Sequence, residues 1–135
     1  MIQRLHHVGL VVPDLGAALA SYAKLPGVRV GEPFELTERR YRLAYVDLGN
    51  CLIELTQPLT PDSVAGRLLA ANPQGALNHL AFEVDDVDEA RTRLLDQGAL
   101  PMGSGGAATD RFGARVVVVD ATATHGTLFE LRQPG

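Results

Sequence analysis

The sequence predicts an α+β protein built from two tandem copies of a β-α-β-β-β module. Three observations predict this class: an internal repeat, apolar residues that alternate between strand and helix spacing, and turn residues between those segments. The repeat relates His7 to His79 and Asp14 to Asp86 at an offset of 72 residues. Each copy also closes on a similar apolar segment that contains one glutamate. A duplicated module explains all three observations.

The first module is predicted over about residues 4–57. Residues 4–12 are rich in apolar side chains typical of strands, and Pro13 ends this strand. Asp14 is a suitable N-cap for a helix whose apolar residues follow at helical spacing until a Pro-Gly pair ends it. The last two strands are joined by the two-residue hairpin signal Gly49-Asn50. The later strands of this module are predicted near residues 28–30, 41–48 and 51–56.

A linker with its own short helix is predicted over about residues 58–74, because Asn72-Pro73 ends an apolar stretch there. The second module is predicted over about residues 76–133 and repeats the order of the first. Its helix begins near Asp86 and ends before Gly98, a suitable C-terminal cap. Its strands are expected near residues 78–84, 100–102, 114–119 and 127–132. Residues 1–135 are expected to form a single domain.

Composition and charge limit the partners. The 135 residues are 46% hydrophobic and 21% charged with a net charge of −4, and no basic run exists to neutralise phosphates. No apolar run approaches the ~20 residues of a membrane span. The single Cys51 excludes an internal disulfide and suits a reducing compartment. We therefore expect a cytoplasmic protein with no nucleic-acid and no membrane partner.

Four polar residues recur at equivalent places of the repeat. Glu54 and Glu130 each lie within an apolar strand, and alternation points each carboxylate away from its apolar neighbours. For one such residue a solvent-exposed side chain is the commoner explanation, but recurrence together with His7 and His79 favours a shared site. Two carboxylates held close together repel unless a cation neutralises them, and two imidazoles with two carboxylates can bind a divalent metal. His6 lies outside the repeat and is interpreted as a surface residue or a neighbour of the ligands.

The whole chain resembles the vicinal oxygen chelate (glyoxalase/bleomycin resistance/dioxygenase) superfamily. The likeness is strongest to its methylmalonyl-CoA epimerases, in residues 54–63 with the short helix that follows and in residues 77–86. The resemblance implies a cup-shaped mixed β-sheet of paired modules around one divalent metal. Co, Mn, Ni, Zn and Fe all suit mixed imidazole and carboxylate ligands. The metal ligands that the resemblance implies are His7, Glu54, His79 and Glu130.

The resemblance also implies an isomerase that epimerises a 2-substituted malonyl-CoA of the methylmalonyl-CoA type. Its partner is a small acyl-CoA, its reaction is proton transfer through a metal-stabilised enolate, and its relatives are commonly homodimers. Glu130 or Glu54 is expected to be the catalytic base on one face of the substrate. The base for the opposite face is open, with Glu38 and Asp47 as candidates. No cofactor besides the metal is expected.

Two alternatives stay open. Lactoylglutathione lyase (glyoxalase I) uses the same ligand types and also moves a proton, and residues 39–45 faintly suit its second strand. A metal-free small-molecule-binding module, as in the antibiotic-resistance members of the superfamily, has the same fold. The linker after Glu54 favours the epimerase over the lyase, and the complete ligand set counts against the metal-free module.

Overall fold

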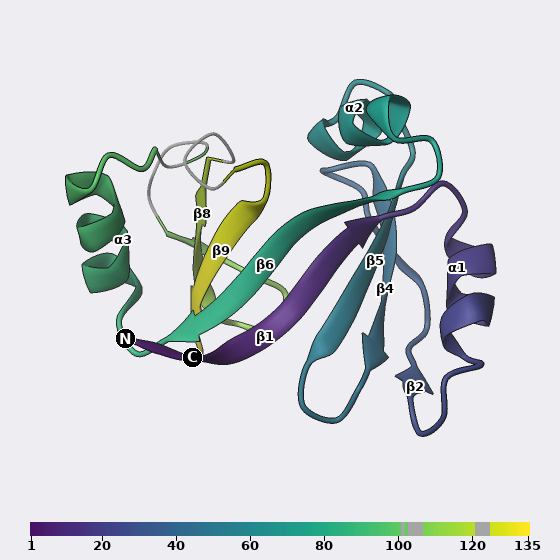
Figure 1. The fold of residues 1–135 in the computed structure, drawn as a ribbon, viewed down its shortest axis with the longest axis horizontal. Coiled ribbons are helices and arrows are strands. Elements are labelled where there is room, and N and C mark those ends of the chain that lie inside the picture. The colour runs from purple at the N-terminus through teal and green to yellow at the C-terminus, as the bar shows by residue number, and fades with distance from the viewer. Residues whose placement is uncertain (101, 103–106, 121–124) are drawn as a thin grey trace. The chain divides into compact units, whose positions relative to one another are not determined.

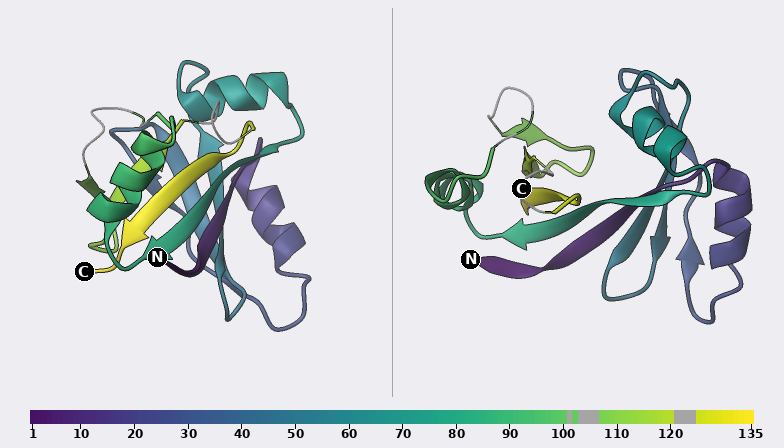
Figure 2. Two further views of the ribbon diagram at one scale, coloured as in Figure 1. Left: turned by 60° about the vertical axis from the view of Figure 1, so that its left-hand side comes forward. Right: turned by 45° about the horizontal axis from the view of Figure 1, so that its top comes forward.

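The computed structural model describes residues 1–100, 102, 107–120 and 125–135. Over these residues it contains three helices and nine strands, which confirms the predicted α+β class. The chain folds as two compact units, residues 7–78 and residues 1–6 with 79–135. Within the described ranges, no helix has the length and apolar character that crossing a bilayer requires. Figure 1 and Figure 2 show the elements of each unit.

The unit of residues 7–78 contains a mixed sheet in the order β2-β4-β5-β1, with β3 also paired to β4. β1 and β5 are parallel, whereas β4 runs antiparallel to β5, β2 and β3. The predicted hairpin is confirmed: Gly49 has a φ of 92°, and the Leu48 N–H donates to the Cys51 carbonyl at 3.0 Å. The elements are β1 (Ile2–Val11), α1 (Leu15–Tyr22), β2 (Arg29–Val30), β3 (Phe34–Leu36), β4 (Tyr41–Asp47), β5 (Leu52–Pro58) and α2 (Val64–Ala71).

Helix α1 covers one face of β4 and β5 (Figure 1). Its Leu15 is fully buried against Val46 and Leu55, and Ile53 packs against the same cluster. Burying such side chains contributes about 1.5–3 kcal/mol each. Because Ile53 and Leu55 face the helix, the Glu54 between them points to the opposite face, as the alternation predicts.

The unit of residues 1–6 and 79–135 has the strand order β6-β9-β8-β7, with β6 parallel to β9 and β8 antiparallel to both β9 and β7. Its core joins Val87 of the helix to Val84, Val117 and Leu131 of the strands. The strand expected near residues 100–102 includes residue 101, which lies outside the described residues. The elements are β6 (Ala76–Val84), α3 (Val87–Asp96), β7 (Ala108–Thr109), β8 (Arg115–Val119) and β9 (Leu128–Gln133).

The hydrogen bonds at the first turn of α1 recur at the first turn of α3. Asp14 and Asp86 each accept hydrogen bonds from first-turn amides, at 3.0 and 2.9 Å, which confirms both as N-caps. Gln57 and Gln133 each accept a bond from the first helical amide, at 2.8 and 3.1 Å. Each glutamine lies three residues after the glutamate of its module. The strand that carries the glutamate is therefore fastened to the helix of the same module.

Candidate metal centre

In the unit of residues 7–78, strand pairing brings His7 to Glu54. The parallel register of β1 and β5 places Gly9 opposite Glu54, so His7 lies on the same strand two residues earlier and points to the same face. The His7 Nε2 atom is 3.5 Å from the Glu54 Oε2 atom. The two side chains are 4% and 16% exposed, so the pair is largely removed from bulk water while the carboxylate keeps an open side.

In the other unit, the same register brings His79 to Glu130. β6 and β9 are parallel with Ala81 opposite Glu130, which matches the Gly9–Glu54 pairing of the first unit. The His79 Nε2 atom is 3.9 Å from the Glu130 Oε2 atom, and the side chains are 11% and 18% exposed. The structure therefore joins each predicted histidine to the predicted glutamate of its own module.

The geometry of both pairs fits ligation of a metal. Each nitrogen–oxygen separation is longer than a good hydrogen bond. Two ligand atoms that each lie about 2.1 Å from one zinc-like ion are roughly 3.0–3.5 Å apart. The His7–Glu54 separation lies within this range, and a small side-chain movement would bring His79 and Glu130 into it. Imidazole nitrogen and carboxylate oxygen are also the donor types that first-row divalent ions accept. Each pair can therefore supply two ligands.

Tyr45 contacts both candidate ligands of this unit, although the sequence analysis did not identify it. Its hydroxyl donates a hydrogen bond of 2.7 Å to the Glu54 Oε2 atom, and its ring meets the His7 ring edge to face with centroids 6.1 Å apart. The Thr56 hydroxyl lies 3.4 Å from the other oxygen of Glu54. Burial and these contacts hold the first pair in one arrangement.

A charged cluster lies on the face of the sheet that carries His79 and Glu130. Glu83 and Arg132 are on this face because they follow Ala81 and Glu130 by two residues on adjacent strands. The Arg132 side chain, 4% exposed, donates to Glu83 at 3.2 Å and to Asp110 at 2.8 Å. Burial would raise the pKa of Asp110, but hydrogen bonds from Arg132 and from the Ala114 amide hold that pKa below its ordinary value.

His6 belongs to this cluster and is buried, so its interpretation as a surface residue is wrong, whereas its interpretation as a neighbour of the metal ligands stays a prediction. It is 8% exposed, and its ring meets the edge of Phe112 with centroids 6.2 Å apart. Burial, followed by the positive charge of Arg132, lowers the pKa of His6. The histidine was misread because its place outside the repeat says nothing about burial.

The two candidates for the second base lie in different settings. Asp47 ends β4, where it accepts from the Gly49 amide at 2.8 Å and pairs with Arg29. The Gly49 bond and then Arg29 lower the pKa of Asp47. Glu38 lies exposed in the turn between β3 and β4. A lowered pKa makes Asp47 a weaker base, and we assign neither residue.

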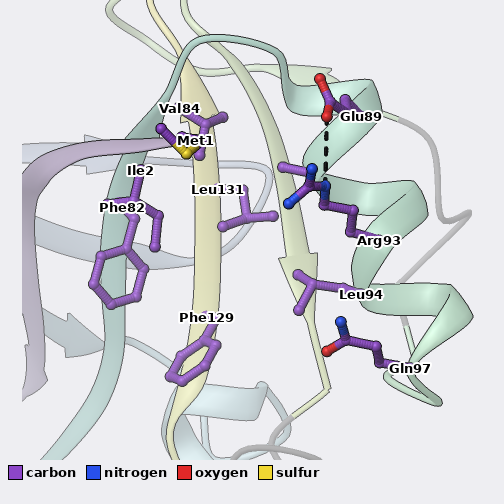
Figure 3. A pocket seen from close by; sticks show the side chains of 11 residues that line it. Met1, Ile2, Phe82, Val84, Glu89, Arg93, Leu94, Gln97, Phe129 and Leu131 are labelled. Atoms are coloured by element: carbon purple, nitrogen blue, oxygen red, sulfur yellow. Dashed lines mark ion pairs between the residues drawn. The ribbon is translucent and has the colours of Figure 1, made fainter.

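A cavity of about 430 Å³ lies between α3 and the sheet of the same unit. Figure 3 shows Phe82 and Phe129 on one side of it and Leu94 on the other. These strand residues alternate with Ala81 and Glu130, so they point to the helix side of the sheet. The cavity is therefore on the face opposite the His79–Glu130 pair and does not belong to the candidate metal centre.

Comparisons with known proteins show the family to which this chain belongs. The model of the Glyoxalase/Bleomycin resistance protein/Dioxygenase superfamily matches residues 6–118, and the chain belongs to this superfamily. Within it, the chain is 38% identical over 133 residues to the ethylmalonyl-CoA/methylmalonyl-CoA epimerase of Cereibacter sphaeroides, covering 98% of this chain and 99% of that protein. The predicted likeness to the methylmalonyl-CoA epimerases is thereby confirmed.

Solved structures agree with this assignment. The methylmalonyl-CoA epimerase from Mycobacterium tuberculosis superposes with a TM-score of 0.85 at 26% identity, covering 99% of this chain and 89% of that one. A methylmalonyl-CoA epimerase in complex with methylmalonyl-CoA and NH4+ superposes with a TM-score of 0.86 at 27% identity, covering 100% of this chain and 96% of that one.

Proposed function

We propose that this chain is a metal-dependent isomerase that epimerises a 2-substituted malonyl-CoA of the methylmalonyl-CoA type. The observation that carries the proposal is the pair of His–Glu contacts at identical strand register, His7 with Glu54 and His79 with Glu130. The relative from Cereibacter sphaeroides, which bears the name of this activity and matches over nearly its whole length, supports the choice of substrate class.

We infer that the two pairs jointly hold one divalent ion, either Co, Mn, Ni, Zn or Fe. Each pair alone offers two ligands, whereas protein sites for such ions use three or four. A bound ion of this kind supplies Lewis-acid stabilisation of the negative charge that develops on the substrate oxygens. Carboxylate oxygens and the lone pairs of imidazole nitrogens are ligands for such an ion, and both pairs are largely buried.

Glu54 or Glu130 takes the role of the base. The acidic hydrogen is on the carbon between the carboxylate and the thioester of the substrate. The C–H bond breaks, the proton moves to a glutamate oxygen, and the electron pair is delocalised onto the thioester oxygen. Return of a proton to the opposite face of the same carbon inverts its configuration. Both glutamates keep part of their surface exposed, which leaves them accessible to a substrate.

The proposal includes a cytoplasmic homodimer with an acyl-CoA as its small-molecule partner. The single cysteine supports a reducing compartment. The epimerase structure in complex with methylmalonyl-CoA supports the acyl-CoA partner. The homodimer rests on the family resemblance alone, and the mass of the purified protein in solution tests it.

Exchange of hydrogen with heavy water tests the activity. Protein stripped of metal and then reloaded is incubated with methylmalonyl-CoA, and mass spectrometry follows deuterium at the carbon between the two carbonyl groups. We expect metal-dependent incorporation, which E130Q or E54Q lowers by about 10²- to 10⁴-fold, the usual contribution of a general base. E32Q, which changes an exposed glutamate, is the matched control and retains the wild-type rate.

The same preparation separates the alternatives. Turnover of methylglyoxal with glutathione, without exchange into several acyl-CoA thioesters, would identify a lyase instead. Tight binding of a small antibiotic by protein that acquires no metal would identify a binding module. Either result would refute the epimerase.

A further inference from the structure

One side chain touches both candidate ligands of the first module. The Tyr45 hydroxyl donates to the Glu54 Oε2 atom at 2.7 Å, and the same oxygen is 3.5 Å from the His7 Nε2 atom. The Tyr45 ring meets the His7 ring at an interplanar angle of 81°. The ring also stacks on Phe34, with centroids 6.2 Å apart and an interplanar angle of 20°. Tyr45 therefore contacts the His7 imidazole, the Glu54 carboxylate and the Phe34 ring.

The second module provides an internal comparison. In the first module, Tyr45 lies opposite Glu54 in the antiparallel pairing of β4 and β5. The equivalent position opposite Glu130, in the pairing of β8 and β9, is Val118. Valine has no hydroxyl to donate. The phenol is therefore a feature of the first module alone, and the duplicated fold does not require it.

We propose that Tyr45 is a positioning residue that orients the Glu54 carboxylate beside His7 for metal binding. A charge-assisted hydrogen bond to one carboxylate oxygen restricts rotation of the group and reduces the entropy lost when a ligand oxygen is fixed. The stack on Phe34 holds the phenol in place. This inference rests on the proposed function, in that the site must bind a divalent ion.

Titration of the metal-free full-length protein with Co²⁺, followed by visible absorption, tests the proposal. We expect Y45F to weaken Co²⁺ binding about 10-fold, the lower end of the effect of removing a partner that orients a ligand. Y22F is the matched control, because it removes a phenol hydroxyl from helix α1, where Tyr22 packs against the apolar core. Its dissociation constant should stay within about twofold of that of the wild type, and thermal unfolding without metal confirms that each variant is folded.

A double-mutant cycle tests whether the effect passes through Glu54. In an E54A background, Y45F should no longer change the Co²⁺ dissociation constant, because the carboxylate that it orients is gone. An equal loss in both backgrounds, or a Y45F dissociation constant equal to that of the wild type, would overturn the role of Tyr45 while leaving the metal site intact. Wild-type protein that binds no Co²⁺ would overturn the proposed metal site and this inference together.

Discussion

At the scale of single residues, Arg132 shows how this fold buries a positive charge. A buried cation is costly unless carboxylates neutralise it, and Arg132 has Glu83 on one side and Asp110 on the other. Asp110 also accepts hydrogen bonds of 2.9 Å from the amides of Phe112 and Ala114. One carboxylate therefore fixes both the arginine and the turn that leads into β8.

Replacing Asp110 by asparagine should lower stability in a pH-dependent way. The folded-state pKa of Asp110 lies below its ordinary value of 3.8, so its contribution is fully present above that value and is lost as pH falls through the folded pKa. At neutral pH we expect D110N to cost about 1–3 kcal/mol, the penalty for weakening a hydrogen bond to a charged group. Urea unfolding at a series of pH values measures this difference.

The wild-type and D110N curves should converge at acidic pH, where the carboxyl group of the wild type is protonated. D62N, which changes an exposed carboxylate, serves as the control and should run parallel to the wild type. A constant difference between D110N and the wild type across the acidic range would show that the ion pair is not the cause.

The contact between Tyr45 and Glu54 could have been predicted from the sequence. A two-residue turn at Gly49-Asn50 makes Leu48 and Cys51 partners, and counting outwards then pairs Tyr45 with Glu54. The contact of Arg132 with Asp110 had no such signal, because the turn after β7 is not set by a two-residue hairpin. A two-residue turn fixes which residues of the two strands are paired, so the sequence predicts the contact. The conformation of a longer turn depends on tertiary contacts, which the sequence does not show.

At the scale of elements, helix α2 depends on a close approach of backbone. Its N-cap Ser63 accepts from the Gly66 amide at 2.9 Å. A Cβ atom at Gly66 would lie 2.3 Å from the Thr60 carbonyl oxygen and 2.9 Å from Pro61. These neighbours are backbone atoms that cannot rotate away. The first turn of this helix therefore has room only for glycine at that position.

Substituting alanine at Gly66 should destabilise the protein by about 1–3 kcal/mol, the usual cost of overpacking. G16A is the matched control, because Gly16 also lies in the first turn of a helix but its nearest new contact is at an ordinary 3.5 Å. Since alanine is the better helix former, G16A should be neutral or stabilising by about 0.5–1 kcal/mol. Chemical denaturation of both variants measures the contrast, and equal effects would contradict the steric argument.

The longer elements were predictable because each carries its own signals. Helices α1 and α3 were predicted from the N-caps Asp14 and Asp86 and from the helical spacing of the apolar residues that follow them. The hairpin of β4 and β5 was predicted from its turn residues. Strand β3 was missed. Three residues are too short for alternation to be recognised, and the strand exists through its pairing with β4, a tertiary contact.

At the scale of the whole molecule, duplication explains why the two His–Glu pairs are so alike. The offset is 72 residues between the histidines and 76 between the glutamates, so the second copy carries a four-residue insertion between these points. The strand pairing around both sites is nevertheless the same. The repeat therefore predicted which residues pair, whereas the burial of these residues needed coordinates.

The stoichiometry of metal binding tests whether both modules serve one ion. If His7 and His79 ligate the same ion, the protein binds one equivalent per chain, and either H7A or H79A weakens binding by about two orders of magnitude. If each module binds its own ion, the protein takes up two equivalents, and each variant keeps one. Elemental analysis after equilibrium dialysis counts the ions. His125 is exposed at a φ of 58°, which asparagine tolerates, so H125N is the control and should bind like the wild type.

Thermal unfolding measures metal binding independently, through the stability that a bound ion gives to the folded chain. An ion that binds only the folded chain stabilises it by about 2.7 kcal/mol at a free concentration 100 times its dissociation constant. The wild type and H125N should gain this stability from added metal and lose it with a chelator. H7A and H79A should gain far less at the same concentration, because each lacks one of the joint ligands. Retention of the full increment by either variant would mean that its histidine does not ligate the ion, and the shared site would have to be abandoned.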